Sequence, residues 1–205
     1  MPGRGSDVAA CTVGYAVGSM PFGLWLGKLA RGVDVREHGS GGMGTTNVLR
    51  TVGPAAAGAV FVLDVAKGAA AVAAARALGA SRAGQAGAGF AAVVGHSWPV
   101  FARFRGGKSV ATAFGALLLL SPEGSAAAVI GGLSALAVSR TVSVGSLAAA
   151  ASATVGSGVA VVRRRKTSAF AFTAAASAVI AVRHAANIRR LLRGEEPQVS
   201  LRRSR

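Results

Sequence analysis

The sequence of 205 residues contains a single cysteine, Cys11, and only seven acidic residues against 23 Lys and Arg. A single cysteine excludes an intramolecular disulfide framework and any metal cluster built on several thiolates. Charged residues make up 15% of the chain, whereas soluble domains carry about 25%. Hydrophobic residues reach 52% and the mean hydropathy is +0.50. The composition therefore indicates a membrane protein.

Several catalytic signatures are also missing. There is no Gly-x-Ser-x-Gly elbow and no Gly-x4-Gly-Lys-Ser/Thr phosphate loop. The His-x4-Asp signature of a common class of acyltransferases is absent, because Met43, Phe101 and Arg189 stand five residues after the histidines. We predict no acidic residue that orients a histidine beside a serine nucleophile, which argues against a triad hydrolase. Without metal-ligand spacing, neither a metal nor another cofactor is expected.

The formal net charge of +16 would suggest a nucleic-acid partner if the rest of the chain were polar. Here the cations lie between apolar runs. This pattern favours contact with lipid headgroups, a positive-inside orientation and anionic substrates. We therefore expect no nucleic-acid partner.

Seven apolar segments predict an all-α, polytopic integral membrane protein with about seven transmembrane helices, some short or re-entrant. They lie at 8–29, 55–75, 84–101, 110–120, 125–139, 144–162 and 168–183. The first is too long for a signal-peptide core and is interpreted as a retained span. The sequence SPEGS at 121–125 separates the short fourth and fifth segments. Ala and Gly dominate the segments, which allows close helix packing. We expect one membrane-embedded domain over 1–205, with a short external N-terminus at 1–7 and a basic cytosolic tail at 197–205.

Counts of Lys and Arg predict the orientation. With seven crossings, the side that holds 28–50, 101–109, Arg140 and the chain from Arg183 onward carries 15 cations, against 7 on the other. The positive-inside rule places the richer side and the C-terminus in the cytosol. The RRRK run at 163–166 is an exception, and a cytosolic place for it would make two segments re-entrant or interfacial.

Two polar segments on the expected cytosolic side carry anion-binding features. The first, VREHGSGGMGTTNVLRTVG at 35–53, mixes glycines with hydroxyls, an amide and arginines. Such a loop can point backbone N–H groups and guanidinium groups at phosphate. In the second, FRGGKSVAT, Lys108 follows two glycines and precedes a helix whose positive end can attract an anion. A flexible loop and an ordinary basic turn are the respective alternatives.

A third polar segment, VRHAANIRRLLRGEE at 182–196, places His184 and Asn187 three residues apart, so on a helix they share a face. Arg183 and Arg190 are seven apart, so we expect them near one another on that helix. A structural histidine and a basic tail that touches headgroups are the alternatives.

Two smaller features complete the polar inventory. The segment SRTVSVGS at 139–146 brings Ser143 and other hydroxyls to a helix junction. Asp64 and Lys67 lie three residues apart inside the second apolar segment. Ionisable residues in a membrane span suggest function, although an internal ion pair explains this spacing equally well.

Together these stretches resemble the bacterial acyl-phosphate:glycerol-3-phosphate acyltransferase family, integral membrane enzymes of phospholipid synthesis. The similar segments are GSMPFGLWLGKLARGVDVREHGSGGMGTTNVLRTVG at 18–53, VLDVAKGA at 62–69, GHSWPVFARFRGGKSVAT at 95–112 and RHAANIRRLLRGEE at 183–196. The likeness runs in matching order from Gly14 to Glu196.

The resemblance implies transfer of an acyl group from acyl phosphate to the 1-hydroxyl of sn-glycerol 3-phosphate, which gives lysophosphatidate and inorganic phosphate. It also implies a site on the cytosolic face of the bacterial cytoplasmic membrane, among membrane lipids, and an acyl-phosphate-producing enzyme as a functional neighbour. Ser40, His184 and Asn187 would be catalytic, and Glu196 structural. The residues expected to bind substrate or phosphate are Ser40, Asn47, Arg50, Gly106, Gly107, Lys108, Ser143, His184 and Asn187.

This chain departs from the family pattern at a few positions. The family usually has Gly-Ser-Gly-Asn where this chain has GSGG, so Gly42 replaces a side-chain amide. Thr45 stands where Ala is usual, Ser109 where Gly is common, and Gln198 where a basic residue is common.

Our hypothesis is that Lys108, Arg50 and Ser40 hold phosphate while His184 and Asn187 orient glycerol phosphate. The hydroxyl proton passes either to the donor phosphate or to His184 as a general base, and the sequence leaves both open. A transporter or channel for a small organic anion is the alternative function, although no two related halves are evident. A basic membrane scaffold without catalysis is the other.

Overall fold

The computed structural model describes residues 3–164 and 167–199, and the regular structure within these ranges is helical. The helices are α1 (Arg4–Gly18), α2 (Phe22–Arg31), α3 (Thr45–Thr51), α4 (Pro54–Ala77), α5 (Arg82–Ser97), α6 (Val110–Leu120), α7 (Pro122–Ser139), α8 (Val142–Arg164), α9 (Thr167–Arg183) and α10 (Ala185–Leu192), with 3-10 turns η1 (Val35–Glu37) and η2 (Val100–Ala102). The all-α prediction is confirmed for these residues.

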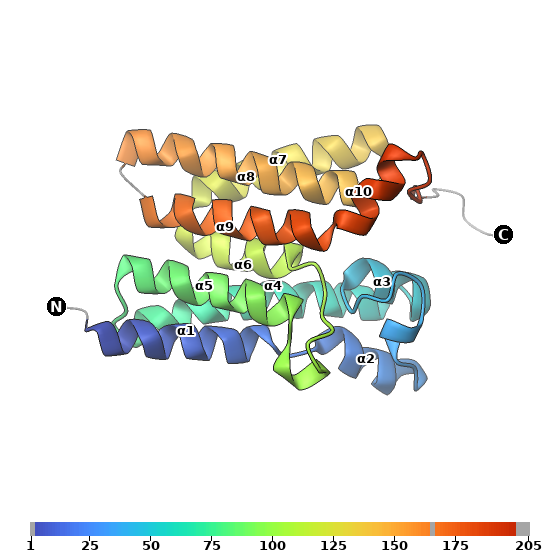
Figure 1. The fold of residues 1–205 in the computed structure, drawn as a ribbon, viewed down its shortest axis with the longest axis horizontal. Coiled ribbons are helices and arrows are strands. Elements are labelled where there is room, and N and C mark those ends of the chain that lie inside the picture. Colours follow the sequence, from blue (N-terminus) through green and yellow to red (C-terminus); the bar gives the residue numbers. More distant parts are fainter. Residues whose placement is uncertain (1–2, 165–166, 200–205) are drawn as a thin grey trace.

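The long helices form one bundle (Figure 1). Helices α1, α4 and α5 pack together on one side, α7 and α8 pack together on the other, and α6 and α9 lie between the two groups. The short helices α2, α3 and α10 gather at one end of the bundle, the end near which the described chain finishes. The polar segments of the sequence therefore lie at the same end.

Small residues allow the close approach of α1 and α5. A Cβ added at Gly14 would collide with the carbonyl oxygen of Ala88, and one added at Gly18 would collide with that of Ala92. Backbones this close gain dispersion contacts that do not depend on water. The predicted role of Gly and Ala in helix packing is thus visible at this pair of helices.

The helix boundaries differ from the predicted segments in three places. The helix expected to reach residue 101 ends at Ser97, before Pro99 and the 3-10 turn η2. The segment expected at 8–29 is two helices, because Pro21 has no N–H to donate and its ring cannot continue α1. The break expected over 121–125 is confined to Ser121, since Pro122 stands at the first position of α7, where the missing N–H costs nothing.

Three helical stretches are long and apolar enough to cross a membrane: Arg4–Arg31, Pro54–Ala77 and Val142–Val162. Helices α9 and α10, bent by 61°, make a fourth if they are taken as one span. The described residues therefore fit a multi-pass membrane protein, and the number of seven crossings stays a prediction. Arg165 and Lys166 of the RRRK run, together with 200–205 of the tail, lie outside the described residues.

Candidate active site

A polar cavity of about 310 Å³ lies where the polar segments meet. The predicted site residues that line it are Ser40, Asn47, Arg50, Gly107, Lys108, Ser143, His184, Asn187 and Glu196. Arg190 contributes a third cationic side chain to the lining, beside Arg50 and Lys108. Residues up to 156 positions apart thus converge on one space, as the hypothesis of a single cationic site requires.

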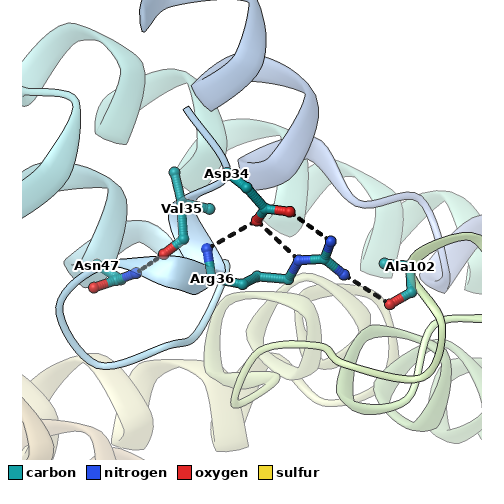
Figure 2. A network of polar contacts seen from close by, with 5 residues as sticks. All are labelled: Asp34, Val35, Arg36, Asn47 and Ala102. Atoms are coloured by element: carbon teal, nitrogen blue, oxygen red, sulfur yellow. Dashed lines mark hydrogen bonds and ion pairs between the residues drawn. The ribbon is translucent and has the colours of Figure 1, made fainter. Parts of the chain in front are cut away.

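Asn47 organises the first polar loop. Its Nδ2 donates to the carbonyl oxygens of Val35 and Gly42, each at 2.7 Å, and its Oδ1 accepts from the N–H of Ser40 at 2.9 Å. Figure 2 shows the first of these bonds. The side chain is only 3% exposed. Because its amide is already fully engaged, the geometry favours a loop-shaping role for Asn47 over the direct phosphate contact that we expected.

Arg36 connects the first polar loop to the 3-10 turn η2, which precedes the second polar segment (Figure 2). Its guanidinium donates to Asp34 Oδ1 at 2.9 Å and Oδ2 at 2.6 Å, and to the carbonyl oxygen of Ala102 at 2.9 Å. The hydrogen bond and charge of Arg36 lower the pKa of Asp34 to about 2. The carboxylate is therefore charged at neutral pH and keeps the guanidinium in place against the Ala102 turn.

A chain of hydrogen bonds links Lys108 to the C-terminal segment. Lys108 Nζ donates to Asn187 Oδ1 at 2.6 Å, and Asn187 Nδ2 donates to Glu196 Oε1 at 2.5 Å. Ser143 Oγ also donates to Glu196 Oε1 at 2.8 Å, and Arg190 Nε donates to Oε2 at 2.7 Å. Glu196 is thus the common acceptor of three side chains from two helices, α8 and α10, which fits its predicted structural role. Ser143 contacts it directly.

Burial shifts the pKa of Lys108 and of Glu196 in one direction, and their ionic or hydrogen-bonding partners shift it in the other. Burial lowers the pKa of Lys108 to about 8 and outweighs the attraction of Glu196, with further lowering by the cations Arg190, Arg50 and Arg183. Burial alone would raise the pKa of Glu196, but hydrogen bonds from Asn187, Ser143 and Arg190 hold it below its ordinary value. At neutral pH the cavity therefore keeps its positive charge, with the amine of Lys108 close to its titration range.

His184 stands at the bend between α9 and α10, and its side chain is buried. Its Nδ1 lies 2.8 Å from the carbonyl oxygen of Ile180. A carbonyl oxygen can only accept, so Nδ1 carries the proton, and the neutral ring keeps its lone pair on Nε2. His184 lines the polar cavity, so its imidazole can accept a hydrogen bond or a proton from a molecule there.

Gly106 is the one predicted site residue that does not line the cavity. A Cβ there would collide with the carbonyl oxygen of His96 and with the ring of Pro99. At the adjacent Gly107 a Cβ would collide with His96 Nε2. Both glycines are therefore required by close packing against His96.

Asp64 lies beside His96, a contact that was not predicted from the sequence. Asp64 Oδ1 is 3.4 Å from His96 Nδ1 and 2.8 Å from Lys67 Nζ, so the predicted Asp64–Lys67 pair is confirmed and a third member joins it. Lys67 also donates to the carbonyl oxygen of Met20 at 2.9 Å. Asp64 and His96 both line the polar cavity. The opposite nitrogen of His96 faces Gly107, so no triad results.

A second, apolar cavity of about 340 Å³ lies between α4, α6, α7, α8 and α9. Most of its lining is aliphatic or aromatic, and its α8 wall consists largely of small residues such as Gly145, Ala149, Ala150 and Ala153. The residues common to both cavities are Phe61, Val110, Ala111, Val142 and Ser146. The polar and apolar spaces are therefore adjacent. This cavity was not predicted from the sequence, because it forms only when five helices assemble.

The sequence profile of the family described as glycerol-3-phosphate acyltransferase matches residues 8–194. The chain belongs to this family. It is similar to the glycerol-3-phosphate acyltransferase of Synechococcus elongatus, with 40% identity over 205 residues and 96% of each chain covered. These matches confirm the resemblance drawn from the motifs.

Solved structures of the glycerol-3-phosphate acyltransferase family have the same fold. The crystal structure of PlsY (YgiH), an integral membrane glycerol 3-phosphate acyltransferase, in its glycerol 3-phosphate form gives a TM-score of 0.87 at 35% identity. The match covers 95% of this chain and 96% of that one. The lysophosphatidic acid form gives a TM-score of 0.84 at 34% identity over the same shares. The chain is therefore a multi-pass membrane protein with the architecture of that enzyme.

Two departures from the family pattern have a plain structural setting. A Cβ at Gly42 would meet only Ser40 Oγ, at 3.9 Å, so a larger side chain would have room at this position. Ser109 adopts a left-handed φ of 61°, a conformation that costs a non-glycine residue about 1–2 kcal/mol. Its buried hydroxyl donates to the carbonyl oxygen of Val93 at 2.7 Å and lies 2.6 Å from Ser97 Oγ. These bonds offset the backbone cost.

Proposed function

We propose that the protein transfers an acyl group from acyl phosphate to the 1-hydroxyl of sn-glycerol 3-phosphate, with lysophosphatidate and inorganic phosphate as products. The observation that carries this proposal is the adjacency of a cationic cavity and an apolar cavity that share five lining residues. A substrate with an anionic head and a long apolar tail matches both spaces at once.

The polar cavity suits two phosphorylated molecules. Two phosphate groups repel each other, so a site that holds both needs several cations, and Arg50, Lys108 and Arg190 line it together. Val110 and Ala111 begin α6 beside the same cavity, and Ser109 does not cap this helix through its side chain. The first N–H groups of α6 are thus available to an anion.

The apolar cavity suits the acyl chain of the donor. Its lining excludes charge, and transfer of each methylene group from water to such surroundings contributes about 0.8 kcal/mol. With the tail there, the acyl carbonyl lies near the shared residues Ser146 and Val142, beside the polar cavity. Glycerol 3-phosphate, held near His184 and Asn187, then has its hydroxyl next to that carbonyl.

In the proposed step the 1-hydroxyl oxygen attacks the acyl carbonyl carbon and forms the new ester bond. The bond between that carbon and the phosphate oxygen breaks, and phosphate leaves with the electron pair. Acyl phosphate has a good leaving group, so positioning of the two substrates can supply most of the rate acceleration. Positioning can lower the activation free energy by about 7–11 kcal/mol. The hydroxyl proton goes to the departing phosphate or to Nε2 of His184. His184→Ala separates the two routes: loss of turnover with unchanged affinity for glycerol 3-phosphate would exclude transfer to phosphate alone.

The proposal includes the place of the reaction. The distribution of Lys and Arg supports a single membrane domain whose cavity faces the cytosol. Acyl phosphate is a reactive mixed anhydride, so a separate enzyme that makes it must supply the donor on that side.

The test is a direct assay of the purified protein with acyl phosphate and glycerol 3-phosphate, in which lysophosphatidate and phosphate are both measured. We expect the two products in equal amounts, strong loss of activity in Lys108→Met, and unchanged activity in Lys28→Met, where the lysine is exposed on α2. Acyl-CoA is offered as a second donor. Lysophosphatidate from acyl-CoA but not from acyl phosphate would refute the donor, and uptake of glycerol 3-phosphate into vesicles without product would favour a transporter.

A further inference from the structure

Arg183, the last residue of α9, donates hydrogen bonds to Gly106 and Gly107, the two glycines that precede Lys108. Its Nε donates to the carbonyl oxygen of Gly107 at 2.9 Å, and its NH2 group donates to that of Gly106 at 3.0 Å. The guanidinium also lies over the ring of Trp98, 5.6 Å from its centroid. One planar group therefore contacts two successive peptide groups and an aromatic face, a combination that only arginine provides.

These two bonds determine which way the loop presents its donors. In a trans peptide the C=O and the next N–H point in opposite directions. With the Gly106 carbonyl turned to Arg183, the N–H of Gly107 points away and donates to the carbonyl oxygen of His96 at 3.0 Å. With the Gly107 carbonyl held in the same way, the N–H of Lys108 points away from Arg183. No turn or loop hydrogen bond within the described residues uses that N–H.

Arg183 itself does not line the polar cavity, although Gly107 and Lys108 do. It therefore lies behind the loop. The segment around it is under backbone strain, since Arg103, Phe104 and Ser109 all have left-handed φ values of 54° to 61°. Such a segment keeps its shape only when its surroundings hold it there.

We propose that Arg183 is a positioning residue for the proposed acyl transfer: it fixes the peptide planes of Gly106 and Gly107 so that the N–H and side chain of Lys108 face a substrate phosphate. This inference rests on the proposed function for its kinetic consequence. Its structural consequence, ordered binding of phosphate by the loop, does not require acyl transfer.

The test compares Arg183→Lys with Arg183→Gln. Lysine keeps the charge and most of the stem but cannot make two parallel bonds to successive carbonyls. If the fork geometry matters, both variants should lose about 100-fold in kcat/KM, as expected for a misplaced binding group. The KM for at least one phosphorylated substrate should rise. Binding of inorganic phosphate, measured by calorimetry, should weaken in both. Trp98→Phe should move the same quantities in the same direction by a smaller factor.

Arg189→Gln is the matched control, since this arginine lies on α10 six residues after Arg183, is exposed and donates only to its own helix. It should leave kinetics, phosphate binding and the melting temperature unchanged. Near-normal activity in Arg183→Lys would overturn the inference, because a positive charge alone would then be sufficient at this position. A fall in kcat with unchanged KM and phosphate affinity would also overturn it, because general destabilisation has that signature. If Arg183→Gln does not fold, Arg183→Lys alone decides.

Failure of the proposed function would look different. Wild-type protein would then form no lysophosphatidate from acyl phosphate, while its affinity for inorganic phosphate could still be compared with that of Arg183→Lys. Equal phosphate affinity in these two proteins would sink the inference about Arg183 whatever the reaction is.

Discussion

Replacing Glu196 by glutamine should loosen the C-terminal segment, part of which lines the polar cavity. Hydrogen bonds to a charged group contribute about 1.5–3 kcal/mol each and neutral ones about 0.5–1.5. Glutamine keeps one oxygen, so the bonds from Asn187 and Ser143 weaken by about 1 kcal/mol each. The bond from Arg190 is lost, but that side chain is 38% exposed, so its loss adds at most about 1 kcal/mol.

The expected total is a fall of about 2–3 kcal/mol in the free energy of unfolding. Thermal unfolding in detergent measures it, with Glu195→Gln as the control because this neighbouring glutamate is exposed. Ser143→Ala tests whether the Ser143 bond depends on the charge of Glu196. The loss of unfolding free energy that it causes should be much smaller in the Glu196→Gln background than in wild type. Additive costs, or a melting temperature of Glu196→Gln equal to that of Glu195→Gln, would refute the reasoning.

Three further predictions concern the cavities. Because the pKa of Lys108 is lowered to about 8, its amine loses charge as the pH rises through 8; kcat/KM should fall there in wild type, and the fall should move to higher pH in Lys108→Arg, since arginine stays protonated. Gly107→Ala should abolish activity because the new Cβ meets His96 Nε2, whereas Gly58→Ala, with open space around it, should be silent in the same assay. Ala150→Phe should fill the apolar cavity and reduce kcat/KM for long acyl phosphates at least roughly tenfold more than for short ones; an equal loss for all chain lengths would place the acyl chain elsewhere.

The helices were predictable because apolar runs of sufficient length can satisfy their backbone only as helices in lipid. The predicted segment 110–120 and α6 have the same bounds. The two prolines acted differently for a local reason. Pro21 lies inside an apolar run and interrupts it, whereas Pro122 begins a helix and shortens the gap before it. Attention to the position of each proline would have given both boundaries.

Most of the polar residues that line the cavity were predictable from the three polar segments, but their partners were not. The pair Asp64 and Lys67 follows from helical spacing, whereas His96 joins it from another helix. Spacing along one chain segment carries no information about such a contact. For the same reason Arg183 and Arg190, expected side by side on one helix, engage different groups: the 61° bend between α9 and α10 separates their roles.

A common physical requirement explains why several polar side chains near the cavity donate to backbone carbonyl oxygens. A loop that binds an anion through N–H groups must turn its carbonyl oxygens to the opposite side, where burial leaves them costly unless a donor is present. Here Asn47 donates to the carbonyl oxygens of Val35 and Gly42, and Arg183 donates to those of both glycines of the second loop. Arg36 does the same for the Ala102 carbonyl. Amides and guanidinium groups are the side chains best suited to two carbonyls at once. A polar side chain near such a loop can therefore lie on the N–H side, where it contacts the anion, or on the carbonyl side, where it donates to the backbone. Only the fold distinguishes these two positions.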